Sequence, residues 1–265
     1  MVEPVDYLNE GDYQQASQQQ ESYQQEQEQE PEVVPCCECD CQMYIESYVP
    51  QDNLCPNCKN KKNMQEIYNK IKACKGCKLI DTCTNKVCGE GSFETDRILF
   101  IGEGPGKEED EAGRPFIGNS GTILDMLLEK VDLDKKEHYF TNIVKCRPPE
   151  NRNPRPEEIE KCLPFLMSQI ELLKPKYIVC LGNHAVNALF TYFSISNSIK
   201  PISQIHGQLN IGISPKGKDV LYSRVKLIPM YHPAVALYRP ELRQDMVADM
   251  EKLANEYKYD DNLPF

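Results

Sequence analysis

The chain has 265 residues, 40% of them hydrophobic, and its sequence has no apolar run long enough to span a membrane. The amino terminus lacks the basic start and apolar core of a signal peptide, so we expect an intracellular, cytoplasmic protein. The net charge is −11, but residues 1–60 contain thirteen acidic residues and one lysine. The remainder is therefore close to neutral and can present a local basic groove, so the acidity does not exclude a polyanionic partner.

The first sixty residues divide into two segments of unusual composition. Residues 1–35 are rich in glutamine and glutamate and poor in apolar side chains, which predicts a disordered acidic tail of unknown partner. Residues 36–60 contain two cysteine pairs at the spacing of a small zinc ribbon. These possible zinc ligands are Cys36, Cys39, Cys55 and Cys58. Cys37 and Cys41 make the first pair ambiguous, and a flexible cysteine-rich linker is the alternative.

From residue 74 onward, apolar runs typical of buried strands alternate with amphipathic helical patterns. The expected strands are 97–101, 139–144, 177–181 and 226–230. The expected helices are 122–131, 156–173 and 184–192, with a long helix after Pro240. This alternation predicts an α/β fold, a three-layer α/β/α sandwich with a central, mostly parallel four-stranded sheet.

Glycines and polar residues follow several of these strands. Gly102 and Glu103 follow the first strand, Asn142 ends the second, and His232 follows the last. Ligands of parallel sheets bind beyond the carboxyl ends of the strands. The glycine-rich turn 102–106 lets backbone amides approach a ligand closely. The sequence therefore predicts a catalytic pocket at this edge.

Five segments, in this order along the chain, carry a resemblance to a known family. They are Gly102–Gly106, Glu109-Asp110, Gly113–Gly118, Thr141–Pro149 and His232-Pro233. Together they closely resemble family 4 uracil-DNA glycosylases, the iron–sulfur members of that superfamily, over roughly residues 74–256. The resemblance implies a monomeric, monofunctional enzyme that hydrolyses the N-glycosidic bond of uracil in DNA and starts base-excision repair. In a prokaryote it would be associated with the nucleoid.

The resemblance also implies a [4Fe–4S] cluster held by four cysteines, the usual ligand set for such a cluster. The matching positions are Cys74, Cys77, Cys146 and Cys162. Spacing alone leaves open a local set, in which Cys83 and Cys88 join Cys74 and Cys77. In either case we expect a structural role.

The same resemblance suggests roles for the residues at the strand ends. His232 would donate to uracil O2 as negative charge develops there, and Glu103 would orient the attacking water or stabilise the sugar cation. Gly104 would offer its backbone N–H to the uracil carbonyls, and Phe116 would stack on the flipped base. Asn142 would pair with O4 and N3–H and reject cytosine. Taken alone, Glu103 could be a helix cap, Phe116 a core residue and Asn142 a turn residue.

Two further regions are candidates for contact with DNA. Arg147, Arg152 and Arg155 lie in a proline-rich loop that suits phosphate contacts, although a solvated surface loop is the alternative. The family inserts a wedge into the duplex from the segment after His232, which points to Leu237 or Tyr238.

Three other functions are alternatives to this one. A non-catalytic, metal-containing DNA-binding scaffold and a glycosylase for other deaminated bases remain open. A phosphate-binding loop fails on spacing, because Ile101 stands where such a loop needs glycine and Glu108 follows the lysine. The remaining histidines, His138, His184 and His206, have no motif context and are expected to be structural.

Overall fold

The computed structural model describes residues 32–35, 42–45, 54–193, 195, 200–209, 211–212 and 226–261. The chain divides into two compact units, Met1–Cys55 and Pro56–Phe265. In the first, strands β1 (Glu32–Pro35) and β2 (Gln42–Ile45) form an antiparallel pair. Strand β1 occupies the last residues of the segment expected to be disordered, where two adjacent valines favour extended backbone. The rest of that tail, residues 1–31, lies outside the described residues.

The predicted zinc module is described only in part. Cys36 and Cys39 lie outside the described residues, and Cys58 lies in the first turn of helix α2 (Pro56–Ala73). The zinc site therefore stays a prediction, and residues 56–60 belong to a helix.

The second unit contains a six-stranded sheet with the strand order β3–β5–β4–β6–β8–β7. Its strands are β3 (Glu90–Gly91), β4 (Ile98–Gly102), β5 (Tyr139–Asn142), β6 (Tyr177–Leu181), β7 (Ile211–Gly212) and β8 (Lys226–Met230). The central four strands are mutually parallel, as the sequence predicts. Strands β3 and β7 add short antiparallel pairs at the two edges.

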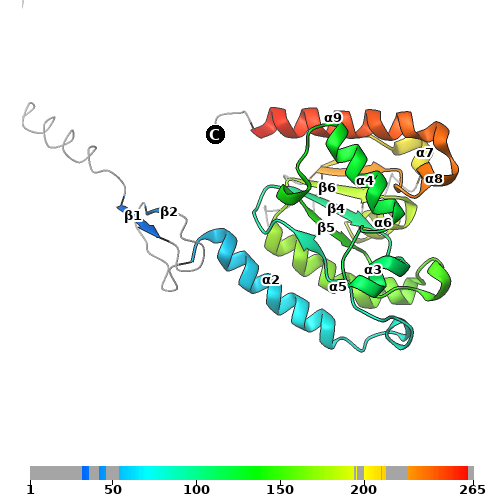
Figure 1. Ribbon diagram of the computed structural model, residues 1–265, viewed down its shortest axis with the longest axis horizontal. Coiled ribbons are helices and arrows are strands. Elements are labelled where there is room, and N and C mark those ends of the chain that lie inside the picture. Colours follow the sequence, from blue (N-terminus) through cyan, green and yellow to red (C-terminus); the bar gives the residue numbers. More distant parts are fainter. Residues whose placement is uncertain are drawn as a thin grey trace, which may run out of the picture. The chain divides into compact units, whose positions relative to one another are not determined.

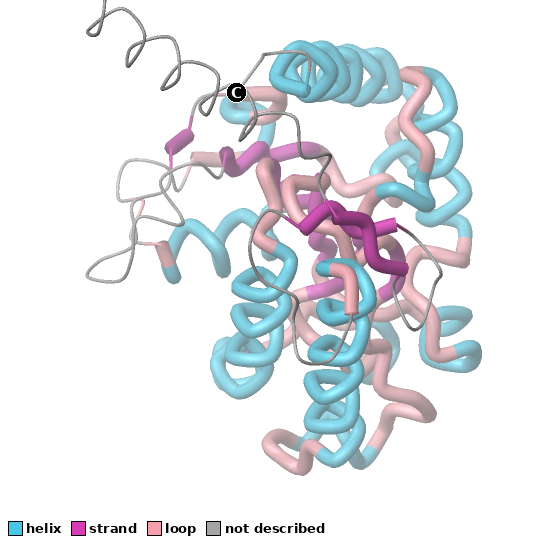
Figure 2. The backbone as a smooth tube through the Cα atoms, turned by 90° about the vertical axis from the view of Figure 1, so that its left-hand side faces the viewer, coloured by secondary structure: helices cyan, strands magenta, loops and turns pink. Residues whose placement is uncertain are grey.

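Helices cover both faces of this sheet (Figures 1 and 2), which confirms the three-layer architecture. The principal helices, besides α2, are α4 (Asn119–Lys130), α5 (Pro156–Leu173), α6 (Asn183–Tyr192) and α9 (Arg243–Asp261). The shorter ones are α3 (Lys107–Ala112), α7 (Ile202–Ile205) and α8 (Val235–Tyr238). Among the described helices, none combines the length and apolarity needed to cross a membrane.

Alternate residues of the strands feed two separate cores. Leu99 and Ile101 of β4 pack with apolar residues of α2, α5 and α6. Ile98 and Phe100 point to the other face and pack with α4 and α9. Because successive strand residues face opposite sides, a strand covered on both faces must be apolar throughout. This explains the uninterrupted apolar runs in the sequence.

Helix α2 precedes the domain expected to begin at residue 74. Its buried residues Met64, Ile67 and Ile71 recur at the three- and four-residue spacing of one helical face and join the core that includes α5. The other positions of α2 are mostly polar. The second unit therefore begins about one long helix earlier than the sequence suggests.

Candidate functional site

The carboxyl ends of the central strands and the loops that follow them line a cavity of about 1030 Å³, part of it open to solvent. Every predicted catalytic and base-binding residue lines this cavity. They are Glu103, Gly104, Phe116, Asn142 and His232. Their segments come together because β4, β5 and β8 are parallel, and Gly102 is the register partner of Asn142. The structure thus unites residues that lie more than a hundred positions apart.

Asn142 and Phe116 meet over the backbone of Gly102. A methyl group added to Gly102 would lie 2.5 Å from Asn142 Oδ1 and 2.8 Å from Phe116 Cζ. Both side chains are buried, and the Phe116 ring also packs edge-on against Phe140 at a centroid distance of 6.2 Å. Phe116 has a positive φ of 51°, which non-glycine residues adopt at a cost and which is often found at ligand sites. Phe116 is therefore both a core residue and a wall of the cavity.

Glu103 follows β4 directly and lines the cavity beside His184, a histidine that the sequence predicts to be structural. His184 Nε2 lies 3.9 Å from Glu103 Oε2. Burial raises the pKa of the Glu103 carboxyl, and the charge of His184 opposes that shift. His184 lies in the first turn of α6, and its position just after the end of β6 was the available signal.

His232 is held in one protonation state by burial and by its own loop. Burial lowers the pKa of His232 to about 4, and the charge of Glu109 opposes that shift. The backbone N–H of Ala234 donates to His232 Nδ1 at 3.2 Å. Because Nδ1 accepts this hydrogen bond, the proton of the neutral ring must be on Nε2. His232 is thus a neutral hydrogen-bond donor at neutral pH.

Glu109 fixes the two loops that border the cavity, although the sequence suggested no role for it. Its carboxylate accepts backbone N–H groups of Gly106 at 3.1 Å, Ile117 at 3.1 Å and Gly118 at 2.8 Å. The side chain is buried at the start of α3 and also lines the cavity. Glu109 therefore holds the glycine-rich turn against the loop that carries Phe116.

We expect Glu109→Gln to loosen both loops, because an amide keeps one acceptor oxygen where the carboxylate has two and loses the charge that strengthens these bonds. The free energy of unfolding should fall by about 1.5–3 kcal/mol, and kcat/KM should fall with it. Urea titration and steady-state kinetics measure both. The control is Glu108→Gln at the exposed neighbouring position. Equal behaviour of the two variants would contradict the role given to Glu109.

The three arginines of the proline-rich loop are placed differently from one another. Arg152 lines the cavity, but its guanidinium donates two hydrogen bonds to the buried carboxylate of Glu158, at 2.9 and 2.7 Å. Arg147 donates to Asn151 Oδ1 at 2.7 Å, and the exposed Arg155 side chain lies 3.9 Å from Glu157. The main role of Arg152 in this structure is therefore to stabilise the loop through its two hydrogen bonds to Glu158.

The segment after His232 presents two large apolar side chains to solvent. Leu237 is 49% exposed and Tyr238 is 69% exposed, both in α8. Tyr238 lines the cavity. Such exposure at the mouth of a cavity is compatible with a wedge from either residue.

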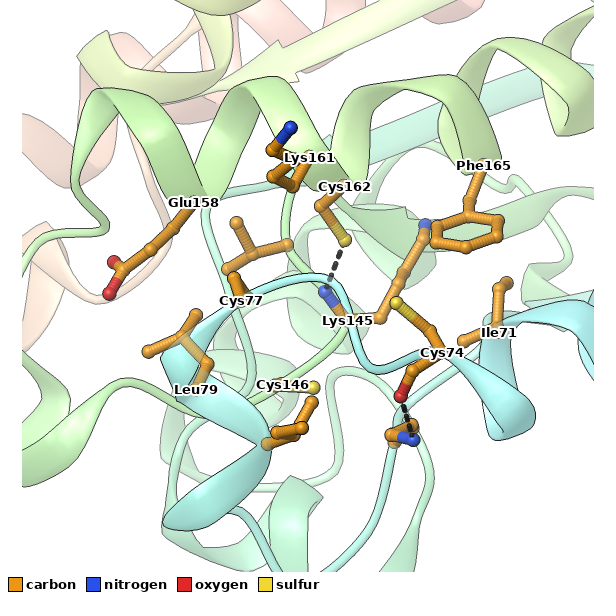
Figure 3. Close-up of a pocket in the computed structure, with 13 residues that line it drawn as sticks. Ile71, Cys74, Cys77, Leu79, Lys145, Cys146, Glu158, Lys161, Cys162 and Phe165 are labelled. Carbon is orange, nitrogen blue, oxygen red and sulfur yellow. Dashed lines mark hydrogen bonds between the residues drawn. The ribbon is translucent and has the colours of Figure 1, made fainter.

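A second cavity lies between α2, α5 and the segment after β5 (Figure 3), with about 350 Å³ of empty space that includes a part open to solvent, and four cysteines line it. They are Cys74, Cys77, Cys146 and Cys162, the set implied by the family resemblance. Figure 3 shows the sulfurs of Cys74, Cys146 and Cys162 facing the space between the segments. Backbone N–H groups donate to two of these sulfurs, Gly76 to Cys74 at 3.3 Å and Lys145 to Cys162 at 3.2 Å.

The chemistry of these cysteines suits a cationic metal group. Burial raises the pKa of the Cys77, Cys146 and Cys162 thiols, and neighbouring cysteines raise it further because each thiolate disfavours the next. A metal group removes that penalty by binding the thiolates directly. In the described part of the chain, no three His, Cys, Asp or Glu residues are arranged to hold one metal ion.

The competing cysteines Cys83 and Cys88 are separated by the fold. Cys88 packs in the core beside α2, with its Sγ 4.0 Å from the Tyr68 carbonyl oxygen. Cys83 packs beside Cys146, whose thiol pKa it helps to raise. The local set proposed from spacing would therefore need Cys88 to leave the core, whereas Cys83 lies next to the second cavity.

Lys145 connects the two cavities through the protein interior. Its buried ammonium donates to Thr141 Oγ1 at 2.6 Å, to the Asn142 carbonyl oxygen at 2.9 Å and to Gln169 Oε1 at 2.7 Å. Burial lowers the pKa of Lys145 to about 8, and the charge of Cys162 opposes that shift. The strand end that carries Asn142 is thus tied to a residue that also lines the cysteine cavity.

Comparisons with known proteins agree with this arrangement. A family model described as the uracil DNA glycosylase superfamily matches residues 88–255. A type-4 uracil-DNA glycosylase of Archaeoglobus fulgidus is 40% identical over 191 residues, which cover 72% of this chain and 92% of that relative. A relative of the same name from Thermotoga maritima is 39% identical over 71% of this chain and 92% of its own length. Another, from Sulfurisphaera tokodaii, is 37% identical over 72% of this chain and 83% of its own length. The chain therefore belongs to the uracil-DNA glycosylase superfamily and to its type-4 family.

Proposed function

We propose that this protein hydrolyses the N-glycosidic bond between uracil and deoxyribose in DNA and leaves an abasic site for base-excision repair. The observation that carries the proposal is the cavity that Asn142, Phe116, Glu103 and His232 line together. The named relatives are uracil-DNA glycosylases, and they match most of this chain. The target base must leave the duplex to enter such a cavity.

The proposed mechanism divides the developing charge between two residues. Bond cleavage leaves negative charge on the base and positive charge on the sugar. The neutral ring of His232 donates from Nε2 to uracil O2 as that oxygen becomes anionic. Glu103, as a carboxylate, accepts a hydrogen bond from the attacking water and stabilises the sugar cation. In addition, the backbone N–H of Gly104 is available to a uracil carbonyl.

Recognition of the base falls to Asn142 and Phe116. The Asn142 amide donates to O4 and accepts from N3–H, whereas cytosine presents an amine and an unprotonated nitrogen at those places. The Phe116 ring stacks on the base. Because Lys145 holds the Asn142 carbonyl, the strand end that bears this amide is fixed before the base arrives.

We expect Asn142→Asp to lose activity on uracil, because a carboxylate repels O4 where the amide donates to it. An unpaired buried polar edge costs about 1–3 kcal/mol, or about a 5- to 150-fold fall in kcat/KM for uracil. Kinetics with uracil- and cytosine-containing oligonucleotides measure the change. Asn119→Asp makes the same chemical change at an exposed position of α4 and should leave both rates unaltered. A fall of the same size in both variants would remove Asn142 from base recognition.

We further propose that Cys74, Cys77, Cys146 and Cys162 hold a [4Fe–4S] cluster. They line one cavity, and backbone amides and the buried Lys145 supply the positive environment that thiolate clusters require. When bound, the group supplies a structural crosslink rather than a reacting centre, because it joins the turn after α2 to the loop after β5 and to α5.

The test of the enzymatic proposal is direct. The purified full chain is incubated with a uracil-containing oligonucleotide, and alkali then cleaves any abasic sites. We expect strand scission with uracil and none with thymine in its place. A scaffold protein would bind the oligonucleotide without scission. A glycosylase for another deaminated base would give scission only with an oligonucleotide that contains hypoxanthine or xanthine in place of uracil. Either result would overturn the proposal.

A further inference from the structure

The carboxyl-terminal part of α2 and the turn that follows it are strongly basic. Residues 56–78 contain seven lysines and one acidic residue, Glu66. Four of these lysines lie near the end of the helix and are joined in space by a lysine of α5. This group, called the α2 basic surface below, consists of Lys70, Lys72, Lys75, Lys78 and Lys161. All five side chains are exposed, and within the described parts of the chain none of them forms an ion pair.

The fold keeps these lysines in solvent. Helix α2 buries Met64, Ile67 and Ile71 against the core, so its polar positions must face outward. Lys86 fixes the end of the helix, because its Nζ donates to the carbonyl oxygens of Lys72 and Cys74, both at 2.7 Å. The α2 basic surface is therefore a group of cations on a helix end whose backbone is fixed by Lys86.

The α2 basic surface lies at the catalytic edge of the sheet. Helix α5 begins at Pro156, immediately after the loop whose Arg152 lines the catalytic cavity. Lys161 lies early in that helix, and its Cβ is 3.8 Å from the position of a methyl group on Gly76. Glu158, which holds Arg152, lines the cysteine cavity together with Lys161. A continuous path of neighbouring residues thus runs from the catalytic cavity to the end of α2.

We propose that the α2 basic surface binds phosphates of the DNA strand beside the catalytic cavity, as a sequence-independent second contact. This rests on the proposed function, since the substrate named there is a polyanion that must already lie across the neighbouring cavity. Exposed lysines with no carboxylate partner suit phosphates, which need charge rather than a fixed hydrogen-bond geometry. Four of the five lysines, Lys70, Lys72, Lys75 and Lys78, precede residues 88–255, which the family model matches, and Lys161 lies within that match.

The test compares two triple variants of the full chain that lose equal charge. The first is Lys72→Gln, Lys75→Gln and Lys78→Gln. The control is Lys59→Gln, Lys61→Gln and Lys130→Gln, at exposed positions away from the proposed contact. Lys59 is about 20 Å from Lys72 along α2, at 1.5 Å per residue. Binding is measured by fluorescence anisotropy on a labelled duplex without uracil, at several salt concentrations.

We expect the first variant to bind at least about tenfold more weakly at about 0.1 M salt, and the slope of log K against log salt to fall by about 0.9 for each lost phosphate contact. The control should keep the wild-type slope, and the excision rate at saturating uracil-containing DNA should be unchanged in both. A wild-type slope in the first variant, or equal losses in the two variants, would overturn the inference. Because binding is measured on a duplex without uracil, it does not depend on excision. A wild type that binds this duplex but releases no uracil from uracil-containing DNA would reject the proposed function and leave this contact standing.

Discussion

Replacing His232 by alanine should slow excision more than any other single change in the catalytic cavity. The expected fall in the single-turnover rate is about 10²–10³-fold, the usual loss when one donor to a developing oxyanion is removed. The ring is already neutral and its Nε2 proton is fixed by the hydrogen bond from Ala234 to Nδ1. The donor is therefore ready before the bond breaks, and alanine has nothing to replace it. Rapid-quench kinetics with saturating enzyme measure the rate without product release.

The pH dependence separates His232 from Glu103. His232 has a lowered pKa of about 4, so it gains a proton only as the pH falls toward 4 and should cause no inflection between pH 5 and 8. Glu103 has a raised pKa, so its carboxylate is lost at a higher pH than usual as the solution becomes acidic. The acid limb of the rate profile should therefore belong to Glu103. It should persist in His232→Gln and vanish in Glu103→Gln. An inflection near pH 6.5 that His232→Gln abolishes would show an ordinary, protonated histidine instead.

The central sheet could be predicted from the sequence because strands buried on both faces are continuous apolar runs. The segments of β4, β6 and β8 are apolar at nearly every position, and the intervening helices have regular apolar spacing. Strands β3 and β7 are two residues long and leave no periodic signal. Helix α2 could not be predicted for a different reason, because its few apolar residues are separated by many lysines and asparagines.

The candidate site was predictable to the extent that it depends on topology. Parallel strands bring their carboxyl ends together, so Glu103, Asn142 and His232 could be assigned to one edge without coordinates. His184 and Glu109 could not be ranked, because their importance arises from neighbours that are distant in sequence or bonded through the backbone. Glu109 did leave one signal, its place three residues after Gly106, where a glutamate side chain can accept the N–H of the residue that precedes the helix.

Cysteine spacing shows the same limit. Cys83 and Cys88 are nearer to Cys74 and Cys77 in the sequence than Cys146 and Cys162 are, yet the cavity is lined by the distant pair. Cys88 lies on the segment that leads into β3 and is drawn into the core beneath α2. Sequence distance cannot reveal this, because the direction of a buried side chain depends on the element that covers it.

Replacing Cys146 by alanine should remove the iron and destabilise the protein together. A crosslink between Cys77 and Cys146 closes a long loop, and by analogy with disulfides such closure is worth roughly 4 kcal/mol. For a domain of this size, that loss lowers Tm by roughly 10 °C. Excision should also fall, because the loop after Cys146 carries Arg152, which lines the catalytic cavity. Iron and sulfide analysis, visible absorption and a thermal melt measure these effects.

The control is Cys88→Ala, which removes another buried thiol from a position beside α2 instead of the cysteine cavity. It should retain four irons per chain, as should Cys83→Ala, and both should keep the brown colour. Cys74→Ala should behave like Cys146→Ala, because each removes one of the four ligands from a different segment. If Cys83→Ala lost its iron while Cys74→Ala kept it, Cys83 would be the ligand. Cys83, which packs beside Cys146, would then hold the cluster in place of Cys74.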